Sequence, residues 1–117
     1  DWVQEQGPMF NAIRNKDPRD LCIGIDPKIN MLIKKEEIPG IQMGHVHLKG
    51  PIHKTPGAHD EFHQSYFLYE GSGTIHVGDQ TKDVQAPTVV IIPKNTTHSV
   101  EVADSKELRY IYVNQYR

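Results

Sequence analysis

The chain has 117 residues, 37% of them hydrophobic and 24% charged, with a formal net charge of -2 at pH 7. This length supports one domain with a single core. The 13 Lys and Arg residues nearly balance the 15 Asp and Glu residues. The composition therefore favours neither nucleic acid nor a membrane as a partner.

The sequence has no long apolar stretch that could span a membrane, and its N-terminus lacks the pattern of a signal peptide. A single cysteine, Cys22, excludes an internal disulfide and a cysteine-rich zinc site. We therefore expect a soluble, cytoplasmic protein. A removed leader stays open, because the chain begins at Asp1.

The N-terminal residues 1–20 are predicted to form an extension with a short helix. Pro8 occupies a favourable first helical position, and apolar residues follow at helical spacing, so we expect a helix over roughly residues 8–16. In "DLCIGID" the apolar period changes to two, which predicts a strand. We therefore divide the chain into an extension at 1–20 and one domain at 21–117.

The rest of the chain contains short segments typical of strands, separated by Pro, Gly, Asn and Asp. They are "INMLIKK", "IQMGHVHL", "QSYFLY", "TIHVG", "TVVIIP", "HSVEVA" and "ELRYIYVN". No helix of useful length separates them, so a parallel sheet is not indicated. The pattern predicts an all-β sandwich or barrel.

Two of these segments indicate side-chain direction. The alternation in "HSVEVA" directs His98 into the core and turns Ser99 and Glu101 toward water. In "QSYFLY" the alternation places Gln64 and Tyr66 on one face. Polarity does not choose between its two faces, because both carry aromatic residues.

The segment "GAHDEFHQSYFLYEGSG" sets two histidines four residues apart, and "APTVVIIPKNTTHSV" follows it. Together they resemble the two motifs of the cupin superfamily. The resemblance covers roughly residues 41–113. It implies a double-stranded β-helix, the jelly-roll or cupin barrel, here preceded by the short N-terminal helix, and such barrels often hold one divalent metal.

Residue by residue, the resemblance places the metal ligands at His59, Gln64 and His98. In the second motif Asn95 takes the place of a glycine, where a left-handed backbone is tolerable. The sequence departs from the motifs at two ligand positions. The family's first histidine falls on Gly57, and its glutamate falls on Gln64.

Two imidazoles and a neutral amide form a weak ligand set for a divalent ion, so a further donor is expected. His63 lies next to Gln64, where alternation turns it outward unless a bulge turns it in. Glu61 could supply a carboxylate from the loop. His53 is a third candidate, although a position in a loop is the simpler interpretation.

His45 and His47 form a second pair of histidines separated by one residue. The apolar alternation changes at Gly44, so the pair faces outward if a bulge follows, and into the barrel if none does. His76 is interpreted as a surface residue.

Several functions remain open, among them a metal-free barrel whose tyrosines and histidines do proton chemistry. The resemblance implies a metal-dependent enzyme of the oxygenase, isomerase or lyase type, with Fe, Mn, Ni, Cu or Zn and a small oxygen-rich substrate chelated at the metal. Tyr66 and Glu61 are the catalytic candidates. The alternative is a binding module for a small acid, sugar or metal, which the missing ligands favour. We favour the enzyme slightly.

Three tyrosines, Tyr66, Tyr110 and Tyr112, could line a pocket or belong to the core. Small cupins often pair, so the resemblance also implies a homodimer. The N-terminal extension, with Trp2, is the expected contact.

Overall fold

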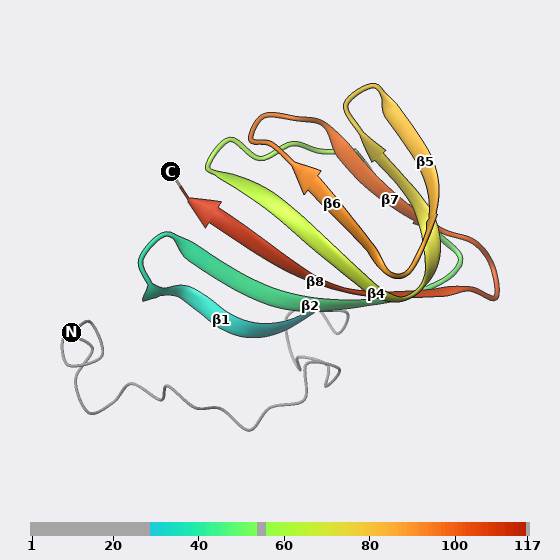
Figure 1. Cartoon of the computed structure of the whole chain (residues 1–117), viewed down its shortest axis with the longest axis horizontal. Coiled ribbons are helices and arrows are strands. Elements are labelled where there is room, and N and C mark those ends of the chain that lie inside the picture. The colour runs from blue at the N-terminus through green and yellow to red at the C-terminus, as the bar shows by residue number, and fades with distance from the viewer. Residues whose placement is uncertain (1–28, 54–55, 117) are drawn as a thin grey trace.

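A computed structural model describes residues 29–53 and 56–116 (Figure 1). This part of the chain contains eight strands and no helix, and thus no helix that could cross a membrane. The strands are β1 (Ile29–Ile38), β2 (Ile41–Lys49), β3 (Ile52–His53), β4 (Phe62–Val77), β5 (Gln80–Gln85), β6 (Thr88–Ile92), β7 (His98–Val102) and β8 (Glu107–Tyr116).

All pairs among these strands are antiparallel, and β4 takes part in both sheets of the fold. Its first part pairs with β6 and β8, in a sheet of order β1-β2-β8-β4-β6. Its second part pairs with β5 and β7, and β3 extends that second sheet. Figure 1 shows β4 running beside β8 and then bending up toward β5. The predicted double-stranded β-helix is confirmed.

The hydrophobic core lies between the two sheets. Leu48, Leu68 and Leu108 are 0% exposed, and Val100 and Val102 of β7 are each 2% exposed. Complete burial of each of these aliphatic side chains contributes about 1.5–3 kcal/mol. The alternation of apolar residues in β2, β4, β7 and β8 is therefore what joins the sheets.

The seven predicted strand segments that lie within residues 29–116 are all found in strands, with one correction. "QSYFLY" and "TIHVG" belong to the single strand β4, because the glycines between them bend the strand without ending it. Gly71 has a φ of 94°, next to a bulge between Leu68 and Glu70. The predicted helix at 8–16, the strand "DLCIGID" and Cys22 lie outside the described residues.

Two strands were not predicted. β5 has the sequence QTKDVQ, which is largely exposed and carries little apolar signal, and it forms by pairing with β4 as a hairpin. β3 has only two residues and pairs with β7. Both are held by the neighbouring strand rather than by their own composition.

One prediction of side-chain direction was wrong. Ser99 was expected to face water, but it is only 8% exposed. β7 lies between β3 and β4, and Ser99 is paired with His76 of β4, so neighbouring side chains cover it. Glu101, on the same side of β7, forms ion pairs with His53 and His76.

The bend at Gly71 provides a test of the fold. A Cβ atom at Gly71 would lie 1.9 Å from the backbone oxygen of Glu107, and the φ of 94° disfavours any L side chain. We expect Gly71→Ala to lower the free energy of unfolding by about 2 kcal/mol or more in urea denaturation.

Gly57→Ala is the matched control, because a Cβ there would meet no atom within 4 Å. Its free energy of unfolding should stay within about 0.5 kcal/mol of that of the wild type. Equal stability of the two variants would contradict this account of the bend.

Candidate functional site

A cavity of about 360 Å³ lies between the two sheets. Its walls come from β2, β4, β7, β8 and the loop before β4, and the lining residues are Val46, Gly57, His59, Phe62, Gln64, Tyr66, His98, Ser99, Val100, Tyr110, Tyr112 and Asn114. A larger cleft of about 420 Å³ lies between β5 and β6, but none of its described lining residues is a histidine. We therefore place the candidate site in the cavity that contains His59 and His98.

Backbone hydrogen bonds bring His59 and His98 together. The backbone N–H of His98 donates to the oxygen of Gly57 at 2.8 Å, and the N–H of Asn95 donates to the oxygen of His59 at 2.7 Å. Asn95 has a φ of 65°, so the left-handed backbone expected at the glycine place of the motif is confirmed. These bonds hold the loop of His59 against the start of β7.

The two imidazole rings lie with their centroids 5.0 Å apart. Phe62 stacks on the His59 ring with a centroid distance of 4.6 Å. The Nδ1 atom of His98 lies 3.0 Å from the backbone oxygen of Thr96. A carbonyl oxygen can only accept, so Nδ1 carries the proton and the neutral ring keeps the lone pair on Nε2.

The protonation state of His59 at neutral pH is also the one that a metal ligand needs. Desolvation of its ring lowers the pKa of His59 below the ordinary 6.5, the nearby His98 lowers that pKa further, and Asp60 acts in the opposite direction. A lowered pKa keeps the imidazole neutral at pH 7. Neutral imidazole is the form that binds a metal ion.

Gln64 lies on the cavity face of β4, as its place in the cupin motif implies. Its Nε2 donates to Oδ1 of Asn114 at 2.8 Å, and Nδ2 of Asn114 donates to Oε1 of Gln42 at 2.9 Å. The Oε1 atom of Gln64 is buried and has no hydrogen-bond partner. This atom is the free acceptor of the site.

The sequence analysis missed Asn114 and Gln42. Each occupies an inward-facing position of its strand, and the other inward-facing positions of that strand are apolar or aromatic. Asn114 follows Tyr110 and Tyr112 in β8, and Gln42 precedes Val46 in β2. A polar residue at such a position was the signal that could have identified them.

Three tyrosines, Tyr66, Tyr110 and Tyr112, form part of the cavity wall and also belong to the hydrophobic core, so both interpretations left open by the sequence apply. The rings of Tyr66 and Tyr110 are 4.5 Å apart, and the two side chains share a hydrogen bond. Burial raises the pKa of Tyr66 to about 12, and burial also raises the pKa of Tyr110 and of Tyr112. The hydroxyls therefore stay protonated at neutral pH and act as hydrogen-bond donors, not as bases.

The additional donors considered from sequence do not reach the cavity. His63 is exposed on the other face of β4, where its Nδ1 accepts from the backbone N–H of Lys94 at 3.0 Å. No register shift occurs between Phe62 and Leu68, so alternation keeps His63 outward. Glu61 is exposed and does not line the cavity, and His53 pairs with Glu101 outside it.

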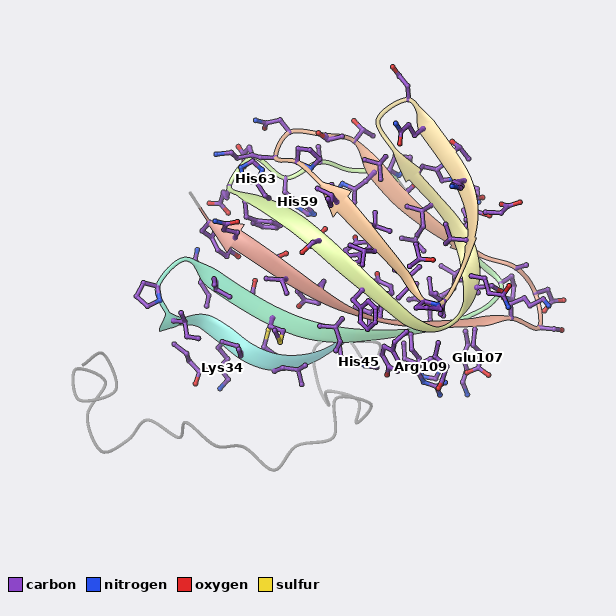
Figure 2. All side chains as sticks on the ribbon, in the orientation of Figure 1. Lys34, His45, His59, His63, Glu107 and Arg109 are labelled. Carbon is purple, nitrogen blue, oxygen red and sulfur yellow. The ribbon has the colours of Figure 1, made fainter. Side chains whose placement is uncertain are left out.

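The pair His45 and His47 faces away from the cavity. β2 pairs with β8 from Ile41 to Lys49 without a register shift, so β2 has no bulge there, and the expectation that both histidines would then point into the barrel was wrong. Val46, between them, lines the cavity, so alternation turns both histidines outward. His45 is fully buried on the outer side of this sheet, where it hydrogen-bonds Tyr69, and His47 hydrogen-bonds Glu107. Figure 2 shows His45, Arg109 and Glu107 projecting from that outer side.

His76 also lies outside the cavity. It is paired with Ser99 of β7, and its ring hydrogen-bonds Thr81 and Glu101. The side chain of His76 is 31% exposed, which agrees with the predicted place at the surface.

Within residues 29–53 and 56–116, no group of three His, Cys, Asp or Glu side chains could hold a metal ion. The candidate metal-ligand atoms at the cavity are the nitrogens of the two imidazoles and the amide oxygen of Gln64. With a metal–nitrogen bond of about 2.0–2.1 Å, the centroid of a bound imidazole lies about 3.2 Å from the ion. When the two nitrogens subtend an angle of about 90° to 109° at the ion, the two ring centroids lie about 4.5–5.2 Å apart. The observed 5.0 Å fits a shared divalent ion.

The comparisons with known proteins agree with this architecture. The family model described as the AraC-like ligand binding domain matches residues 39–115. The chain belongs to this family, and its fold is that of a cupin. Membership of a ligand-binding family supports the binding of a small molecule. None of the curated proteins compared with the chain matches it.

Several solved structures share the fold at low sequence identity. The plu4264 protein from Photorhabdus luminescens has a TM-score of 0.72 and 16% identity, over 92% of this chain and 90% of that one. The Schizosaccharomyces pombe Cnp3 cupin domain has a TM-score of 0.70 and 19% identity, over 76% of this chain.

KdgF from Halomonas sp. has a TM-score of 0.64 and 16% identity, over 80% of this chain and 86% of that one. The chain spans only 60% of the Cnp3 structure. At these identities the likeness shows the fold alone.

The contact between the two imidazoles predicts a measurable titration. In the metal-free protein, NMR titration should give His59 a pKa below 6.5. His98→Ala should raise that pKa, because it removes the charge repulsion between the two imidazoles, while desolvation still holds the pKa below the ordinary value. A His59 pKa unchanged by His98→Ala would contradict the close approach of the two rings.

Proposed function

We propose that this protein binds a small, oxygen-rich organic ligand in the cavity, through a divalent transition metal held by His59, His98 and Gln64. One observation carries the proposal. Two imidazoles with centroids 5.0 Å apart line the same cavity as a buried amide oxygen that has no hydrogen-bond partner. An unpaired buried acceptor is costly, so its presence on a residue of the same cavity wall as two imidazoles supports a bound cation.

The residues of the chain have distinct parts in this proposal. A bound divalent ion would act as a Lewis acid toward oxygen atoms of the ligand. His98 offers Nε2, because Thr96 holds its Nδ1–H. Phe62 covers one face of the His59 ring. The protonated hydroxyl of Tyr66 accepts from Tyr110 and can donate to the ligand, whereas the Tyr112 hydroxyl donates to Met31.

The side chains around the cavity support binding without turnover better than the oxygenase, isomerase or lyase chemistry implied by the resemblance. Among the described residues, no Asp, Glu, Lys or Arg lines the cavity. The raised pKa of Tyr66, about 12, removes this catalytic candidate as a base. Glu61, the other candidate, is exposed outside the cavity.

The identity of the metal, among Fe, Mn, Ni, Cu and Zn, stays a prediction. Imidazole nitrogen donors suit these first-row transition metals better than they suit Mg²⁺ or Ca²⁺, which prefer oxygen ligands. The homodimer and the cytoplasmic location also stay predictions from the sequence.

The metal content of the purified, untagged protein tests the proposal. We expect about one equivalent of a transition metal by mass spectrometry after loading with Fe, Mn, Ni, Cu or Zn. His59→Ala and His98→Ala should each lower the content severalfold, because each removes one of two imidazole ligands.

His63→Ala is the matched control. This histidine lies four residues from His59 in sequence, but it is exposed on the face of β4 opposite to the cavity face that carries Gln64. Its removal should leave the metal content unchanged. Negligible metal in the wild type, or equal loss in all the variants, would refute a site at His59 and His98.

A further inference from the structure

We infer that Met31, Gln42 and Asn114 form a positioning chain, which fixes the end of the Gln64 amide that faces the cavity. The chain is a row of hydrogen bonds that crosses from β1 through β2 and β8 to β4. It selects the carbonyl oxygen of Gln64, not its NH₂ group, as the atom offered to a bound group. The consequence for metal binding rests on the function proposed above, but the orientation of the amide does not.

The row consists of three hydrogen bonds in sequence. Gln42 Nε2 donates to the sulfur of Met31 at 3.5 Å. Asn114 Nδ2 donates to Gln42 Oε1 at 2.9 Å, and Gln64 Nε2 donates to Asn114 Oδ1 at 2.8 Å. The hydroxyl of Tyr116 is a further donor to Gln42 Oε1, also at 2.9 Å. Each amide therefore points its NH₂ group toward the Met31 end of the row and its oxygen the other way. The last oxygen, Oε1 of Gln64, is buried without a hydrogen-bond partner.

Met31, at one end of the row of hydrogen bonds, decides which group of each amide donates and which accepts. A thioether sulfur accepts hydrogen bonds but cannot donate one, so Met31, which also accepts from the Tyr112 hydroxyl, favours the NH₂ end of Gln42 over its oxygen. Gln42 then presents its oxygen to Asn114, which in turn presents its own oxygen to Gln64. If all three amides reversed, the Gln42 oxygen would face the sulfur of Met31, with one acceptor against another.

The same argument accounts for glutamine where the cupin motif has glutamate. A glutamate at position 64 would set its carboxylate against Asn114 Oδ1, which now accepts from Gln64. Asn114 and then Gln42 would have to reverse, and the conflict would move to Met31. The row is thus matched to an amide at position 64, and it directs a neutral acceptor into the cavity.

A buried acceptor without a partner selects an electropositive group. The Gln64 oxygen can bind a metal ion, or a hydrogen-bond donor of the ligand. It repels the oxygen of a carboxylate or carbonyl. Met31, Gln42 and Asn114 therefore help to set the specificity of the cavity without touching the bound group.

The first measurement is the NMR signal of the Gln64 side-chain NH₂ group in metal-free protein. A hydrogen bond to Asn114 should shift one of its two protons downfield and slow its exchange with water. Asn114→Leu should abolish both effects, whereas Asn114→Asp should keep them, because an aspartate still accepts from Gln64. A rapidly exchanging NH₂ group in the wild type would overturn the inference, even if Asn114→Leu does not fold.

The second measurement is the affinity for Co²⁺, followed by its visible absorption. Asn114→Leu should weaken binding about 10-fold to 100-fold, as is typical when a group that orients a metal ligand is lost. Tyr116→Phe is the control, since Asn114 still donates to Gln42 and the direction of the row is kept. Its affinity should match that of the wild type.

The two measurements separate the two proposals. Equal Co²⁺ affinity of the wild type and Asn114→Leu would overturn the positioning chain, while the metal site would stand. Absence of Co²⁺ binding in the wild type would refute the proposed function. In that case the NH₂ signal alone decides whether the amide is fixed as described.

Discussion

The continuity of β4 across both sheets determines the architecture of this protein. This single strand pairs with β6 and β8 in one sheet and with β5 and β7 in the other. The bend at Gly71 joins the two parts, where the backbone of Glu107 leaves no space for a side chain. The sheets therefore diverge from a common strand (Figure 1). The cavity lined by His59 and His98 lies between them.

The enclosed cavity then requires that its polar side chains find partners. Moving an amide from water into such a place is unfavourable unless its hydrogen bonds are replaced. Gln42 and Asn114 meet this requirement within the barrel, and Gln64 meets it only at its nitrogen. The remaining oxygen is buried without a hydrogen-bond partner, and Gln64 lines the cavity together with His59 and His98. Folding thus leaves one acceptor free where two imidazoles are also available.

Those parts of the fold and site that follow from local constraints could be predicted from the sequence. Alternation placed His98 on an inward face, the resemblance to the cupin motif placed Gln64 in the site, and motif spacing placed Asn95 in a left-handed turn. The partners of Gln64 could not be predicted, because Asn114 lies 50 residues away and meets Gln64 only through the register of β4 and β8.

His63 illustrates the converse case. It is near His59 in sequence, and Figure 2 labels both at the same end of the molecule, but strand alternation sets His63 on the outer face. The outward direction of His45 and His47 likewise depends on the unbroken register of β2 with β8. Distance along the chain was a poor guide to the ligand set, since pairing between strands decides which face a side chain takes.

The most direct test of a metal site at the cavity is proton NMR of the Co²⁺-loaded protein, in which protons close to the ion are strongly shifted. The account predicts shifted, exchangeable imidazole N–H signals from His59 and His98, with the His98 signal lost in His98→Ala. Binding of Co²⁺ without shifted imidazole signals, or with signals that survive removal of both histidines, would contradict it.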